Sequence, residues 1–118
     1  MKRLIFVFLI MLILNGLCEA GTITYSWTAP TTDTQGNTLV SDGLTITSYS
    51  LYCGTAAGAE SATPIYTGTA LTYTITGVTD GTSEYCYATA TASNGKVSPQ
   101  SLEVKKTFSA VPSAPTLQ

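Results

Sequence analysis

The sequence predicts an all-β domain folded as an antiparallel β-sandwich of short strands. Three observations support this fold class. Thr, Ser, Tyr, Ile and Val dominate the chain after residue 20, turn-forming Gly, Pro, Asn and Asp recur in clusters, and no stretch there places apolar residues at helical spacing. Helical segments do not alternate with the strands, so a parallel sheet is not expected. A chain of 118 residues has the length of a single domain.

The first twenty residues have the organisation of a secretory signal peptide. A short positive region, residues 1–3, precedes an unbroken apolar run over residues 4–14, which is too short to span a bilayer. Small side chains follow at Cys18 and Ala20, at the spacing that signal peptidase accepts. We therefore predict cleavage after Ala20.

Two alternatives to a cleaved signal remain open. The segment can stay attached as an N-terminal anchor, or Cys18 can be lipidated, although the bulky Leu17 before it differs from the small residue usual in lipoprotein signals. In each case the chain is exported. We expect it to be secreted, periplasmic or on the cell surface, and to touch a membrane only through this segment.

The predicted mature chain is acidic and carries two cysteines. Without residues 1–20 it keeps three lysines against six acids, a net charge of −3, so nucleic acid is not an expected partner. Cys53 and Cys86 are then the only thiols in a chain that enters an oxidising compartment, which favours one disulfide. By the chain-entropy model, closing this loop is worth about 3 to 4 kcal/mol.

The first two strands are predicted at residues 22–28 and 44–53. In the first, Ile23, Tyr25 and Trp27 share one face. In the second, Cys53 shares a face with two other apolar residues, and Tyr52 lies on the opposite face. Residues 31–43, rich in turn formers, connect the two strands.

Four further strands are predicted, at residues 64–67, 71–76, 84–92 and 101–108. Residues 77–82 reverse the chain, and Asn94-Gly95 forms a hairpin turn. In residues 84–92, Cys86 and three alanines share one face, and Tyr85 and Tyr87 lie on the other. The tail, residues 109–118 with two prolines, is expected to be an extended linker.

Three motifs resemble those of a bacterial or phage-type fibronectin type III domain. They are Tyr25-Ser26-Trp27-Thr28-Ala29-Pro30, Ser48-Tyr49-Ser50-Leu51-Tyr52-Cys53-Gly54-Thr55 and Thr76-Gly77-Val78-Thr79-Asp80-Gly81-Thr82. The resemblance covers residues 21–108. It implies an immunoglobulin-like sandwich with strands B, C, C′, E, F and G, in which Trp27 is the buried indole of strand B.

The chain departs from the family in two places. The family has a tyrosine six residues after the position of Val78, whereas this chain has Glu84, so the corner hydrogen bond of that tyrosine is lost unless Tyr85 replaces it. Cleavage after Ala20 also leaves no room for strand A. The tail resembles the opening of a further module, and it is either a plain linker or a strand that pairs with strand B of a neighbouring copy.

The resemblance also predicts which residues face each other. Strands C and F are antiparallel neighbours, which places Cys53 opposite Cys86 on the inner face and Tyr52 opposite Tyr87 on the outer face, with Tyr85 beside them. These three tyrosines are the candidate binding patch, because a tyrosine ring suits both carbohydrate stacking and protein contact. The alternative is a cross-strand pair that only stabilises the sheet.

Catalysis, metals and cofactors are not expected. The chain has no histidine and no C-x-x-C motif, and its acids fall on predicted turns or on a solvent-facing strand. Glu84 is the exception, since it is either an inward-facing acid that marks a site or a strand-end residue that reaches water. Residues 31–43 are a second candidate for recognition, although nothing in them indicates a ligand.

The sequence thus predicts an exported, non-catalytic binding or structural module that contacts protein or carbohydrate at a cell or virion surface. The alternative function is a self-associating or polymerising subunit, completed by a strand donated from the C-terminal tail of a neighbour.

Overall fold

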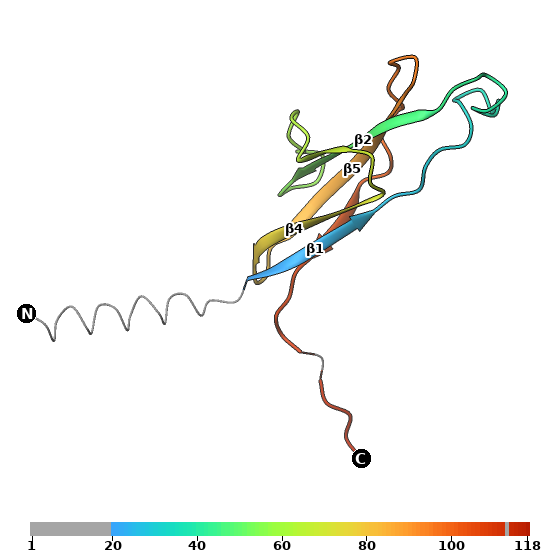
Figure 1. The fold of residues 1–118 in the computed structure, drawn as a ribbon. Coiled ribbons are helices and arrows are strands. Elements are labelled where there is room, and N and C mark those ends of the chain that lie inside the picture. Colours follow the sequence, from blue (N-terminus) through green and yellow to red (C-terminus); the bar gives the residue numbers. More distant parts are fainter. Residues whose placement is uncertain (1–19, 113) are drawn as a thin grey trace, which may run out of the picture.

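The fold is all-β, as predicted, in a computed structural model that describes residues 20–112 and 114–118 (Figure 1). These residues contain six strands and no helix. The strands are β1 (Ala20–Ser26), β2 (Ile46–Gly54), β3 (Tyr66–Gly68), β4 (Thr72–Thr79), β5 (Ser83–Ala92) and β6 (Val104–Thr107). The described part therefore offers no helix that is long and apolar enough to cross a membrane. The predicted signal peptide lies outside the described residues, apart from Ala20.

The strands form two antiparallel sheets, β1-β4 and β3-β2-β5-β6. The number of strands and their order along the chain agree with the sequence prediction. Among the described residues, β1 pairs with β4 alone, and its other side carries no strand. The arrangement is consistent with an immunoglobulin-like sandwich.

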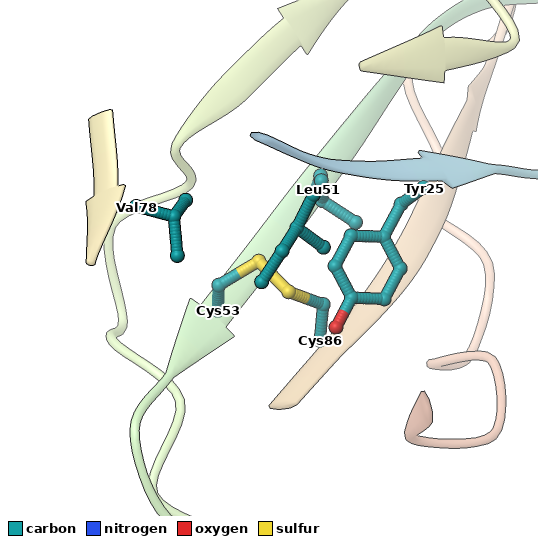
Figure 2. Close-up of a cluster of buried hydrophobic side chains, with 6 residues drawn as sticks. Tyr25, Leu51, Cys53, Val78 and Cys86 are labelled. Atoms are coloured by element: carbon teal, nitrogen blue, oxygen red, sulfur yellow. A yellow bond between two sulfur atoms is a disulfide. The ribbon is translucent and has the colours of Figure 1, made fainter. Parts of the chain in front are cut away.

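The core lies between the two sheets and includes the disulfide. Its fully buried residues come from four strands, because side chains alternate between the two faces of each strand. These residues are Ile23, Tyr25, Leu51, Cys53, Val78 and Cys86. Figure 2 shows the disulfide within this cluster, together with Leu51, Val78 and the Tyr25 ring. No polar or charged residue of the described part is buried.

Trp27 differs from its prediction. β1 ends at Ser26, so Trp27 lies just beyond the strand, although its N–H still donates to the Leu71 carbonyl over 2.9 Å. The residue is half-buried and not fully buried. Its ring lies 6.1 Å from that of Tyr49 and 5.9 Å from that of Tyr66, at the edge of the core.

β6 is shorter than the strand predicted at residues 101–108, since residues 101–103 and Phe108 lie outside it. Before β6, residues 98–101 run beside β5 without forming a regular strand. Pro99 has no N–H to donate. The hydroxyls of Ser98 and Ser101 take the place of backbone carbonyls and accept the N–H groups of Ala90 and Ala88, each over 2.9 Å. The turn predicted at Asn94-Gly95 precedes this segment, with Gly95 at φ +82°.

β4 is longer than predicted, because Gly77 forms a bulge within it instead of starting a turn. Gly21 pairs with Val78 and Ile23 with Ile75, so β4 contains one more residue than β1 over this stretch. Gly77 has a φ of +67°, a conformation that favours glycine. The chain reverses three residues later, where the Thr82 N–H donates to the Thr79 carbonyl over 3.1 Å.

Side chains close both lateral sides of the sandwich. On the side of β1 and β6, the Tyr25 hydroxyl donates to the β5–β6 ladder, 2.7 Å from the Glu84 carbonyl and 3.1 Å from the Val104 carbonyl. On the side of β3 and β4, the rings of Tyr66 and Tyr73 stack with centroids 5.0 Å apart. The two sheets are therefore joined by aromatic side chains at places where no backbone ladder connects them.

Candidate functional site

The disulfide fixes the register of the two central strands of the larger sheet. Cys53 of β2 lies directly opposite Cys86 of β5, as the resemblance predicted, and the two are bonded. Their Cα atoms are 4.2 Å apart, close to the spacing of about 4.5 Å at a pair without backbone hydrogen bonds. Because both sulfurs face the core, the adjacent residues of each strand must face outward.

The predicted tyrosine patch, Tyr52, Tyr85 and Tyr87, follows from this register. Tyr52 lies opposite Tyr87, and their rings stack with centroids 5.0 Å apart and planes inclined by 15°. Tyr85 lies opposite Gly54, with the Lys105 Nζ 5.6 Å from its ring centroid. The three residues are half-buried, not fully exposed as expected. The stacked rings of Tyr52 and Tyr87 cover part of each other, and Lys105 lies over the Tyr85 ring.

A hollow of about 330 Å³ adjoins the patch at Tyr87. It forms where the loop after β2 approaches the segment before β6, and the Gly58 N–H donates to the Glu103 Oε2 over 2.8 Å. We call it the acidic hollow. Its lining residues are Gly58, Glu60, Tyr87, Gln100, Ser101 and Glu103.

Two carboxyl groups meet in the acidic hollow, contrary to the expectation that no acids converge. A hydrogen bond between them raises the pKa of Glu60 and lowers that of Glu103, to which the Gly58 N–H also donates. The Glu60 Oε1 is covered from solvent and has no donor within the described residues. Sequence reasoning missed this pair because the loop brings together residues 43 positions apart.

The acidic hollow has the chemistry of a recognition site. The Tyr87 ring is held in place by Tyr52 and offers an apolar wall, while carboxylates, an amide and a hydroxyl offer hydrogen bonds. Aromatic faces combined with a few polar groups bind sugars and protein side chains alike. Within the described residues, no group of three or more potential metal-ligating side chains occurs.

Glu84 is half-buried at the beginning of β5, and its backbone carbonyl accepts the Tyr25 hydroxyl. Lys106 is its partner on β6. Tyr85, the candidate for the corner hydrogen bond, lies on the outer face beside Lys105. Tyr25 makes the bond that links the two sheets, and burial of its ring raises its pKa. No sequence signal distinguished Tyr25 from the other inward-facing aromatic residues.

Residues 31–43 form an ordered projection beyond one end of the sandwich (Figure 1). Asp33 organises it, because its Oδ1 accepts the N–H groups of Gln35 and Asn37 over 2.9 and 2.8 Å. These hydrogen bonds, that of Asn37 first, lower the pKa of Asp33. Val40, in the same projection, is 87% exposed. The projection remains a second candidate for recognition.

Comparisons with known proteins give no further guide to the site: no family model, no curated protein and no solved structure matches the chain.

Proposed function

We propose that this chain is an exported, non-catalytic module of the fibronectin type III type that binds a protein or glycan surface through the outer face of its larger sheet. The observation that carries the proposal is the stacked pair of Tyr52 and Tyr87 at the rim of the acidic hollow. An aromatic pair that is already ordered loses little conformational entropy on binding.

The strand order supports the family assignment. The larger sheet, β3-β2-β5-β6, has the order C′-C-F-G that the motifs imply, and β1-β4 corresponds to B-E. The motif that led to strand B contains Tyr25, and the motif that led to strand C contains Cys53. Both residues lie in the core.

A non-catalytic role is supported by the position of the two acids. The pKa of Glu60 is raised chiefly by contact with Glu103, and desolvation contributes less. Catalytic acids are typically adjusted by burial within a cleft that excludes water. The acidic hollow is better suited to hold a ligand by hydrogen bonds and ring contact than to exclude water from a reaction.

The test removes the pair of rings and measures binding. The variant Tyr52→Ala/Tyr87→Ala is compared with Ser50→Ala/Thr89→Ala, a directly opposite pair on the same outer face, two residues along each strand. Binding is read on a glycan array and by pull-down from cell-surface material. We expect the tyrosine variant to lose at least about tenfold in affinity, or about 1.4 kcal/mol, and the control to bind like the parent.

The structural alternative gives a different result. If the ring pair only stabilises the sheet, its removal lowers the free energy of unfolding by about 0.2 to 1 kcal/mol and leaves binding unchanged. Equal signals from a folded double variant and the parent would refute the proposal. The variants Glu60→Gln and Glu103→Gln then locate the ligand, because only a ligand that enters the acidic hollow responds to them.

A further inference from the structure

The open side of β1 has backbone hydrogen-bonding groups that no strand of the described residues pairs with. Since the Trp27 N–H points to β4 and backbone groups alternate along a strand, those of Thr24 and Ser26 point to the open side. The Thr24 carbonyl accepts the Lys106 Nζ, and no strand covers it among the described residues. The edge therefore presents the groups that an added strand needs.

An apolar surface lies next to this edge. Val104 pairs with Cys86 and so belongs to the inner face of β6, yet it is 46% exposed. An inward-facing valine is normally covered by the neighbouring strand. The Tyr25 side chain lies beside Val104, because its hydroxyl donates to the Val104 carbonyl, and the Lys106 Nζ lies 5.2 Å from the centroid of the Tyr25 ring.

The C-terminal tail of the same chain has the features of the missing strand. In extended conformation, Val111, Pro115 and Leu117 share one face, and Ala114 and Thr116 share the other. Val111 is 72% and Leu117 98% exposed, so neither contributes to the core in this structure. The tail leaves the sandwich near the beginning of β1 and runs away from it (Figure 1).

Geometry prevents the tail from pairing antiparallel with its own β1. The Phe108 ring packs against Gly21 so closely that residue 21 has no space for a side chain, and the Ala110 N–H donates to the Asp80 Oδ1 over 2.7 Å. The tail therefore begins at the start of β1 and could follow that strand only in parallel. Antiparallel pairing, which continues the pattern of the β1-β4 sheet, requires the tail of another molecule.

We propose that the open edge of β1 binds the C-terminal tail of a second copy of this chain as an antiparallel strand, with Ala114 opposite Thr24. This interaction goes beyond the proposed function, since it uses neither the tyrosine patch nor the acidic hollow. Val111, Pro115 and Leu117 then face the inner side, along the edge that includes Val104, and the Ala114 N–H takes the place of the Lys106 ammonium at the Thr24 carbonyl.

Pro115 fits this register, and Pro112 weakens it. Thr24 directs its side chain outward and its backbone groups to the open side of β1. Ala114, directly opposite Thr24, therefore also faces outward and directs its backbone N–H and C=O to β1, as does Thr116 two residues later. Pro115 directs its missing N–H to solvent, where it blocks the addition of a further strand. Pro112 lies opposite Ser26 and removes one hydrogen bond, so the pairing is short and its affinity modest.

The first test measures self-association of the exported protein by sedimentation velocity, up to about 1 mM, where a Kd in this range is detectable. We expect the average mass to rise with concentration. The variant Val111→Ser/Leu117→Ser should remain monomeric, whereas Ala114→Ser/Thr116→Ser, its matched control on the other face, should associate like the parent. A parent that is monomeric throughout, or association that survives Val111→Ser/Leu117→Ser, overturns the proposal.

Two further measurements identify the edge. Lys106→Met removes the competing ammonium and should strengthen association about threefold or more, while Lys105→Met, on the outer face, should not. A spin label on Leu117→Cys of one copy should broaden the Thr24 and Ser26 amide signals of an isotope-labelled second copy and spare Thr67 in β3. Broadening confined to other strands contradicts the proposed pairing.

Discussion

Reduction of the disulfide between Cys53 and Cys86 should remove a large part of the stability of this domain. The bond closes a loop with a sequence separation of 33, for which the chain-entropy model gives about 4 kcal/mol. A domain of this size is stable by only about 5 to 15 kcal/mol in total. The loss should lower the melting temperature by about 15 to 30 °C, since each kcal/mol corresponds to about 4 to 8 °C.

The assay is guanidinium unfolding of the oxidised and the reduced protein, with Cys53→Ala/Cys86→Ala as a third sample. Reduction keeps both sulfur atoms in the core, so it isolates the effect of the cross-link on the unfolded chain. The alanine variant also leaves a cavity beside Leu51, because Cys53 and Cys86 are only 6% and 1% exposed. It should therefore be less stable than the reduced protein.

Both unlinked samples should show a larger m value than the oxidised protein, because their unfolded chains expose more surface. Ellman titration of the unfolded, unreduced protein should find no free thiol from Cys53 or Cys86. Two titratable thiols, or an unfolding midpoint that is the same before and after reduction, would refute the reasoning.

Three more predictions follow from single side chains. Tyr25→Phe should lower the free energy of unfolding by about 0.5 to 1.5 kcal/mol in a denaturant titration, because it removes the hydroxyl that joins the sheets. The pKa of Tyr25 is raised in the folded protein, so the parent should also lose stability as the pH rises above about 10. The variant, which has no hydroxyl to ionise, should lose less. Asp33 has a lowered pKa, so its contribution to the stability of the projection is present at neutral pH and lost in acid. Protection of the Asn37 amide from hydrogen exchange should therefore fall as Asp33 is protonated. Glu60 has a raised pKa, so its bond to Glu103 favours the fold in acid and is lost as the pH rises through that pKa. Glu103→Gln should lower the pKa of Glu60 in a carbon-detected NMR titration.

Alternation of side chains was sufficient to predict the central strands. The placement of Cys53 with Tyr49 and Leu51 on one face, and of Tyr52 on the other, is what the structure shows in β2. Residues that depend on local backbone chemistry were harder to predict. Gly77 was expected to turn the chain and instead forms a bulge, since a glycine with positive φ is compatible with both.

Contacts made by loops could not be predicted from periodicity. Glu60 lies on a loop and Glu103 just before β6, and no pattern in the sequence relates them. Their meeting depends on the path of residues 55–60, which fold toward the outer face until the Gly58 N–H reaches Glu103. The same holds for Lys106, whose ammonium reaches the backbone of a strand 82 positions away. Such contacts follow from the packed fold and not from the residues near them in sequence.

Side chains rather than backbone ladders hold the two sheets together at their sides. A two-stranded sheet such as β1-β4 is only marginally stable alone, so it depends on packing against the larger sheet. Tyr25 attaches β1 to the larger sheet in two ways. Its ring is buried in the core, and its hydroxyl donates to carbonyls of the β5–β6 ladder. The Lys106 ammonium donates to the Thr24 carbonyl on the open side of β1. A single lysine covers part of this edge in the monomer and can be displaced by an incoming strand. The same edge can therefore be protected in the monomer and still accept the strand of a neighbour, as the proposed pairing requires.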